Sequence, residues 1–223
     1  MRLLTTQNAK TVKGEKKGYL TFILYLAPGD ISGREVCPRR TEACFETCLF
    51  HSGRGRMQSV QEARIRKTKR LFENRKGFMH DLEVDINIAI YQAEKRGLIP
   101  CIRLDGTSDL GLGGKLSKMF PEVQFYDYTK VVQRVRRTRV EDNNYHLTFS
   151  YSGRNKTSCL ELLKYGNNVA VVFADELPEK WWGYPVINGD ENDLRFLDGS
   201  GKIVGLLEKK TGRKTTDEFI QTV

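Results

Sequence analysis

Short apolar segments alternate with helical patterns along most of the chain. The apolar segments are rich in aromatic and β-branched residues and end at turn signals, which is typical of buried strands. They lie at residues 18–28, 99–105, 123–129, 145–152, 168–175, 184–188 and 202–208. The helical spacing of apolar side chains predicts helices at about 59–76 and 78–96, and a further helix, with capping residues at both ends, at 155–166.

This alternation of strands and helices predicts an α/β fold with mostly parallel strands. Parallel strands are usually covered on both faces, and the composition of these segments fits burial on both faces. We expect a single domain over residues 1–223, built as a small or incomplete β/α barrel of the TIM type. A cysteine-bearing loop at residues 29–58 would follow its first strand.

Polar side chains follow most of the predicted strands at the point where the strand ends. In β/α barrels and open α/β sheets, the carboxyl ends of the strands form the functional site. Polar residues are also ordinary turn formers, so the argument rests on several clusters at one end of one sheet. The candidate catalytic or ligand-binding residues are Asp105, Ser108, Asp109, Tyr128, Lys130, Ser150, Ser152, Asn155, Asp190 and Asp193.

Composition and charge narrow the class of protein. A chain of 223 residues with 39% hydrophobic residues is long and apolar enough for a core. No apolar run reaches the roughly 18 residues that span a bilayer, and the N-terminus lacks the apolar core of a secretion signal. We therefore expect a cytoplasmic protein without a membrane partner. The net charge of +9 favours polyanionic partners without establishing one.

Three of the five cysteines are crowded into one polar loop, with the spacing C-x6-C-x3-C at Cys37, Cys44 and Cys48. An odd number of cysteines without an export signal argues against a disulfide scaffold and favours metal or redox chemistry. One helical turn would place Cys44 and Cys48 on the same face. Zinc would require a fourth ligand, for which His51 is the candidate. An iron–sulfur cluster held by three cysteines would leave one iron open to a ligand.

A three-cysteine loop directly after the first strand of a β/α barrel resembles the layout of the radical S-adenosylmethionine enzymes. That resemblance implies a four-iron cluster at the mouth of the barrel. The spacing here differs from that family's C-x3-C-x2-C, and no clear glycine-rich segment follows the second strand. These departures argue against S-adenosylmethionine as a cofactor.

The chain is also similar over nearly its whole length to an uncharacterised family of bacteriophage and prophage proteins. The resemblance implies a phage protein made in the host bacterial cytoplasm, and it implies no particular reaction. The segments that carry it are SGRGR (52–56), RLDGTSD (103–109), FYDYTK (125–130), LTFSYSGRN (147–155), NVAVVF (168–173) and GYPVINGDENDLRF (183–196).

Two functions remain open from the sequence. The first is an iron–sulfur protein that performs redox or cluster-dependent chemistry on a small polar ligand, or with a redox partner, where the cysteine loop meets the strand ends. The second is a zinc-stabilised nucleic-acid-binding protein without catalysis. In the second case a basic helix that carries Arg66, Lys67 and Arg70 would face the phosphate backbone. Cys101 and Cys159 are expected to be buried as small hydrophobic residues.

Overall fold

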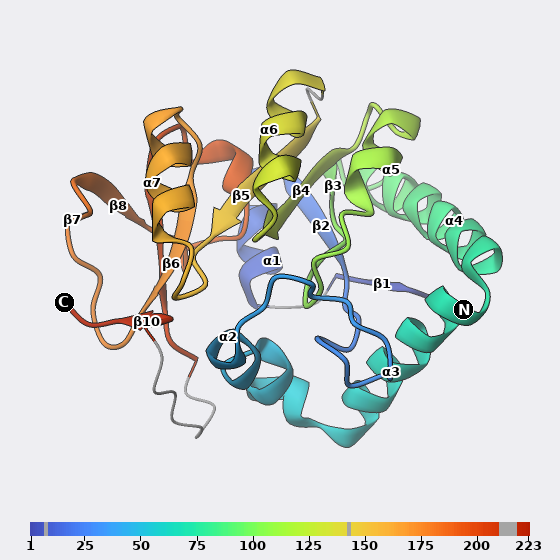
Figure 1. Ribbon diagram of the computed structural model, residues 1–223. Helices are drawn as coiled ribbons and strands as arrows, with labels where there is room; N and C mark the ends of the chain where they lie inside the picture. The colour runs from blue at the N-terminus through green and yellow to red at the C-terminus, as the bar shows by residue number, and fades with distance from the viewer. Residues whose placement is uncertain (7–8, 142–143, 210–217) are drawn as a thin grey trace.

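The computed structural model describes residues 1–6, 9–141, 144–209 and 218–223. In this part of the chain ten strands form one sheet in the order β1-β2-β3-β4-β5-β6-β9-β8-β7, and β10 pairs with β6 (Figure 1). The pairs β1–β2 and β7–β8 are antiparallel, and the others are parallel. The strands are β1 (Leu4–Thr5), β2 (Tyr19–Leu24), β3 (Ile99–Arg103), β4 (Gln124–Thr129), β5 (Tyr145–Ser150), β6 (Val169–Phe173), β7 (Lys180–Trp181), β8 (Tyr184–Asn188), β9 (Ile203–Leu207) and β10 (Ile220–Gln221).

Helices connect the successive parallel strands from β2 to β6 and cover the outer side of the curved sheet (Figure 1). Helix α4 precedes β3, α5 precedes β4, α6 precedes β5 and α7 precedes β6. The helices are α1 (Ala9–Glu15), α2 (Glu42–Glu46), α3 (Gln58–Glu73), α4 (Arg75–Glu94), α5 (Gly113–Met119), α6 (Val132–Glu141) and α7 (Lys156–Lys164), with 3₁₀ turns at Leu49–His51, Gly53–Arg56 and Arg195–Leu197.

The predicted α/β class with mostly parallel strands is confirmed. Each of the apolar segments identified in the sequence contains one strand of the sheet, and the three predicted helices correspond to α3, α4 and α7. In the described residues no pairing joins β1 to β7, so the sheet is an open arc there. None of the described helices is long and apolar enough to cross a lipid bilayer.

The two faces of the sheet carry different side chains because residues alternate along each strand. The aliphatic and aromatic residues of one face, such as Ile102, Phe125 and Phe149, pack with the helices in the main core. On the other face, Cys101 and Tyr126 belong to a separate small cluster. The interior of the arc is therefore lined by an alternate set of residues, separate from the main core.

The segment between β8 and β9 fills this interior. Leu194 packs with Cys101 and Tyr126, and the ring of Phe196 lies 5.1 Å from that of Tyr19 and 5.7 Å from that of Tyr126. The side chain of Arg195 is almost fully buried and donates to the carbonyl of Asn192 at 2.7 Å.

His146 lies in the same interior, because it stands beside Tyr126 in the β4–β5 register and paired residues share a face. Burial and the nearby Arg195 guanidinium lower its pKa from 6.5 to about 4.

The depressed pKa of His146 predicts a loss of stability in mild acid. Between pH 6.5 and 4 the unfolded chain binds a proton at His146 that the folded chain does not bind, so the free energy of unfolding falls as the pH falls. The loss contributed by this group approaches about 3 kcal/mol, and it is complete near the folded pKa. We expect the stability difference between the wild type and His146→Gln, measured by urea unfolding, to change by about this amount between pH 7 and 4.

His80→Gln, at an exposed position on α4, is the matched control. If the difference in free energy of unfolding between the wild type and His146→Gln stays constant with pH, the lowered pKa of His146 is contradicted.

Candidate functional site

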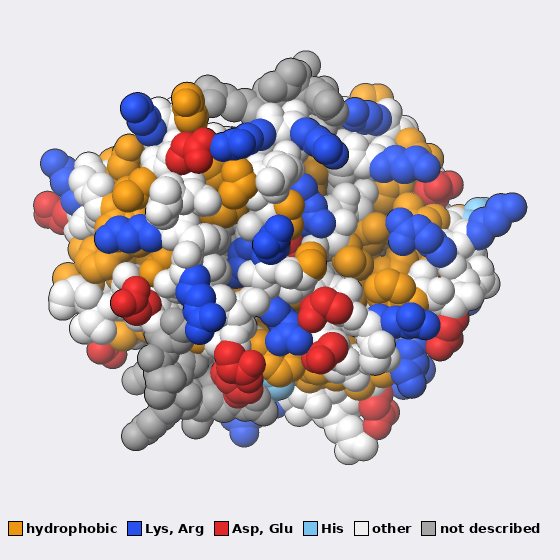
Figure 2. Space-filling model, in the orientation of Figure 1, with side chains coloured by type: hydrophobic (Ala, Val, Ile, Leu, Met, Phe, Trp, Pro, Cys, Tyr) orange, Lys and Arg blue, Asp and Glu red, His pale blue; other side chains and the backbone are white. Residues whose placement is uncertain are grey.

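The carboxyl ends of the central strands surround a cavity of about 440 Å³. On this side of the molecule, basic side chains gather around the centre of the surface (Figure 2). The expected convergence of the cysteine loop and the strand ends is present, because both line this one cavity. The candidate residues that line it are Cys37, Cys44, Cys48, Asp105, Ser108, Asp109, Tyr128, Lys130, Ser150, Asp190 and Asp193.

The cysteine loop is held over the strand ends by contacts far apart in sequence. The backbone N–H of Asp109 donates to the carbonyl of Val36 at 2.8 Å, and the hydroxyl of Thr41 donates to the carbonyl of Ser152 at 2.9 Å. Thr41 also caps α2 by accepting from the N–H of Cys44. Cys48 follows the end of α2 in an extended conformation, so the expectation that one helical turn carries both cysteines is wrong in detail.

The three thiols are close enough to influence one another. The pKa of Cys37 is raised to about 12 and that of Cys48 to about 11, mainly by burial and in part by the neighbouring Cys44. The sulfur of Cys37 accepts from the N–H of Gly29 at 3.5 Å and donates to the carbonyl of Thr107 at 3.7 Å. Without a bound metal, Cys37 and Cys48 are therefore neutral thiols at physiological pH.

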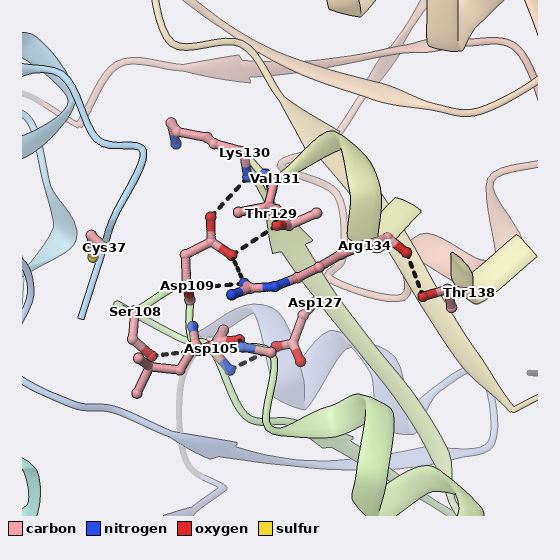
Figure 3. Close-up of polar contacts among 12 residues, drawn as sticks. Cys37, Asp105, Ser108, Asp109, Asp127, Thr129, Lys130, Val131, Arg134 and Thr138 are labelled. Atoms are coloured by element: carbon pink, nitrogen blue, oxygen red, sulfur yellow. Dashed lines mark hydrogen bonds and ion pairs between the residues drawn. The ribbon is translucent and has the colours of Figure 1, made fainter. Parts of the chain in front are cut away.

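Lys130 joins the cysteines to the strand ends. It directly follows β4 and extends toward the side on which Cys37 lies (Figure 3). Its ammonium group donates to the hydroxyl of Ser150 at 3.2 Å. Burial lowers the pKa of Lys130, but the hydrogen-bonded Cys44 and the nearby Asp109 raise it more, so the side chain stays charged.

Asp105 organises the loop that follows β3. Its carboxylate accepts hydrogen bonds from the Ser108 hydroxyl at 2.6 Å and from the N–H groups of Leu110 and Gly111 at 2.9 and 2.7 Å. Burial raises the pKa of Asp105, and these bonds oppose that effect. The loop also requires Gly106, because a Cβ there would lie 2.6 Å from the side chain of Ile23.

Asp109 connects that loop to β4 and α6. Its carboxylate accepts from the Thr129 hydroxyl at 2.8 Å and from the N–H of Lys130 at 2.9 Å, and it pairs with the Arg134 guanidinium (Figure 3). All of these partners lie within the chain. The carboxylates of Asp105 and Asp109 thus hold the strand ends together, and neither is positioned as an unengaged acid or base.

The two remaining candidate carboxylates are also engaged. Asp193 pairs with Arg103 at 3.1 Å and accepts from the Tyr126 hydroxyl at 3.1 Å, while the Arg103 guanidinium lies 4.7 Å from the centre of the Tyr128 ring. Asp190 accepts from the N–H of Leu207 at 2.8 Å and pairs with Lys209 at 3.0 Å.

Three candidates lie outside the cavity lining. The His51 ring packs edge-on against the rings of Phe45 and Phe50. Ser152 and Asn155 bond to each other, the N–H of Ser152 donating to the Asn155 side chain at 2.8 Å. The Asn155 amide also donates to the carbonyl of Ser150 at 3.1 Å, so this pair shapes the turn after β5.

The basic residues of α3 differ in their surroundings. Arg66 is exposed and lies 3.9 Å from Glu62. The Lys67 ammonium donates to the carbonyl of Leu3, and Arg70 pairs with Asp81 at 2.6 Å. All three side chains proposed for phosphate contact thus have partners within the chain, and the contact of Arg66 is the longest and most exposed.

Sequence reasoning missed several residues that line the cavity: Tyr25, Arg40, Arg103 and Phe219. A signal for Arg103 was present, because it precedes Asp105 by two residues and the period of a strand places both on one face. Phe219 has no local signal, since β10 brings it beside β6 from the end of the chain. The expected burial of Cys101 and Cys159 is confirmed.

The geometry required for a single metal ion is not met in the described part of the chain. No group of three or more His, Cys, Asp or Glu side chains there is arranged to hold one ion. Of the four candidate metal ligands, Cys37, Cys44 and Cys48 line the cavity and His51 does not.

Comparison with known proteins gives one family. The family model described as Gene product 88 matches residues 2–222, so the chain belongs to that family. This match is consistent with the expected family of phage proteins, and it shows no resemblance to radical S-adenosylmethionine enzymes. No curated protein and no solved structure matched the chain.

The three hydrogen bonds to Asp105 predict a structural role for this carboxylate. In Asp105→Asn an NH2 group replaces one of the two carboxylate oxygens. This group cannot accept a hydrogen bond, so at least one of the three donors loses its partner. We expect the free energy of unfolding to fall by about 1–3 kcal/mol in a urea titration. Asp175→Asn, at an exposed strand end, is the matched control and should change stability by less than about 0.5 kcal/mol. Equal effects of the two substitutions would argue against this role.

Proposed function

We propose that this member of the Gene product 88 family binds an iron–sulfur cluster through Cys37, Cys44 and Cys48 and uses it on a small ligand in the adjoining cavity. The observation that carries the proposal is that all three thiols line the same cavity as the strand-end residues. A structural metal site would instead be closed by its own ligands. Here the thiols are next to about 440 Å³ of space for a cluster and a ligand.

The donor set fits a cluster better than a single ion. A zinc ion needs four donors within about 2.0–2.3 Å of one point. In the described residues no such set exists, and the His51 ring is packed between Phe45 and Phe50. A cluster is larger than an ion, and each cysteine binds a different iron, so its thiolates stand further apart. Three cysteines then leave one iron of a four-iron cluster without a protein ligand.

The charges around the thiols also support the proposal. Thiolates bound to a cluster carry net negative charge, which is costly to bury without nearby cations. Lys130 is hydrogen-bonded to Cys44 and supplies such a cation. Arg40 also lines the cavity, but its ion pairs with Asp30 at 3.2 Å and Glu35 at 3.1 Å already offset its charge.

The position of the cysteine loop is analogous to that in radical S-adenosylmethionine enzymes, and the analogy is limited to this position. The cysteine loop follows β2, the first long parallel strand, and lies over the carboxyl ends of the sheet. The different cysteine spacing keeps S-adenosylmethionine outside the proposal. A bound cluster would supply electron transfer or a Lewis-acidic iron. The chain would supply a partly enclosed cavity, a charged ammonium group and fixed strand ends.

We expect the loop cysteines, and no others, to be required for iron. Cys37→Ser, Cys44→Ser and Cys48→Ser should each lose most of the bound iron, since each removes one of three strong ligands. The measurement is iron and acid-labile sulfide per chain after anaerobic purification, together with the broad visible absorption of a cluster.

Cys101→Ser and Cys159→Ser are the matched controls, because both residues are buried away from the loop and should leave iron binding unchanged. Full iron retention in any of the three loop variants would refute the ligand set. A colourless wild-type protein with one zinc per chain would refute the cluster itself and support the structural alternative.

A further inference from the structure

The cavity has two chemically different walls. The side formed by β3 and β4 carries Arg103, Tyr128 and Lys130. The side formed by β6, β9 and β10 carries the apolar side chains of Ala170, Val172, Leu206 and Phe219, with Glu208 and Lys209 where β9 ends. The ring of Phe219 lies 5.9 Å from the Lys130 ammonium, so the two walls meet at this residue.

The carboxylates near the charged wall are already engaged by donors within the chain. Asp105 accepts three hydrogen bonds, Asp109 pairs with Arg134, and Asp193 pairs with Arg103. The expectation of a small polar ligand depended on these carboxylates as ligand contacts. Their engagement within the chain removes that argument.

Lys130 differs from the other charged groups at these strand ends. Among the residues that the structure describes, its ammonium group forms no ion pair with a carboxylate, and its partners are the Ser150 hydroxyl and the Cys44 sulfur. An ammonium group has three N–H donors, so one remains for a ligand. Glu208 also lines the cavity, from the end of β9.

We propose that the cavity binds an organic carboxylate with a short apolar body. The carboxylate accepts from Lys130, and the apolar group lies against Val172, Leu206 and Phe219. This inference rests on the proposed function only in treating the same cavity as the ligand site. It names the class of ligand, and it does not require the cluster to be present.

The test compares three probes on the full chain as purified: 4-phenylbutanoate, its neutral amide 4-phenylbutanamide, and acetate. Dissociation constants are measured by ligand-observed NMR, with iron content determined on the same samples. A charge-assisted hydrogen bond and a buried phenyl group are each worth about tenfold or more in affinity. We expect 4-phenylbutanoate to bind at least about tenfold more tightly than either of the other probes.

Variants separate the two walls. Lys130→Met should abolish the preference for the acid over the amide while leaving amide binding within about threefold, and Lys130→Arg should retain the preference. Leu206→Asn should weaken both phenyl probes and leave acetate unchanged. Lys164→Met, at an exposed position on α7, is the control and should behave as the wild type. Thermal unfolding of each variant shows whether it is folded.

Equal binding of the acid and the amide to the wild type would overturn the inference. So would an acid preference that survives in folded Lys130→Met. The two proposals fail separately: a colourless protein that still prefers the acid refutes the cluster alone. A brown protein that does not discriminate between the probes refutes the ligand class alone.

Discussion

The hydrogen bonds that Asp105 accepts from Ser108, Leu110 and Gly111 fix the loop on which the rest of the site depends. A buried carboxylate must be satisfied by donors, and here the donors come from its own loop. The same residue donates its N–H to the Asp127 carboxylate at 2.7 Å. Burial and the charge of Asp105 raise the pKa of Asp127 well above its ordinary value. The loop after β3 is therefore held from both sides, which positions Asp109 against β4 and α6.

Local patterns were sufficient to predict the long elements of the fold. The strands from β2 to β6, with β8 and β9, and the helices α3, α4 and α7 all have apolar periodicity that tertiary contacts reinforce. The two-residue strands β1, β7 and β10 are too short to leave a pattern. They form because longer strands present open hydrogen-bonding edges to them. The position of β9 between β6 and β8 is likewise a long-range property without a local signal.

The sequence was sufficient to predict which residues line the candidate site, but not which role each side chain has there. Polar residues at the carboxyl ends of parallel strands meet by topology, so Asp105, Lys130 and Ser150 line one cavity, as their positions suggest. Their partners depend on side-chain directions that sequence spacing leaves open. Asp109 is engaged by Arg134 from the following helix, and His51 packs between two phenylalanine rings. Residue type therefore indicated where the site lies, while packing decided which groups are available to a ligand.

Burial of the cysteine loop without a metal is consistent with the raised thiol pKa values. A neutral thiol is a small, nearly apolar group, so Cys37 and Cys48 are partly buried at little cost while they stay protonated. The loop is already anchored by Val36 and Thr41 to the strand-end loops, and these anchors do not involve a metal. Under the proposed function, cluster binding would then displace the thiol protons from a loop that is already folded, and metal affinity would rise with pH. Ionisation of the loop thiols would favour the charged form of Lys130, because Cys44 contributes most to raising the pKa of this ammonium group and Asp109 adds to the effect. Proton loss from the thiols and the positive charge of Lys130 would therefore support each other when a cluster is bound.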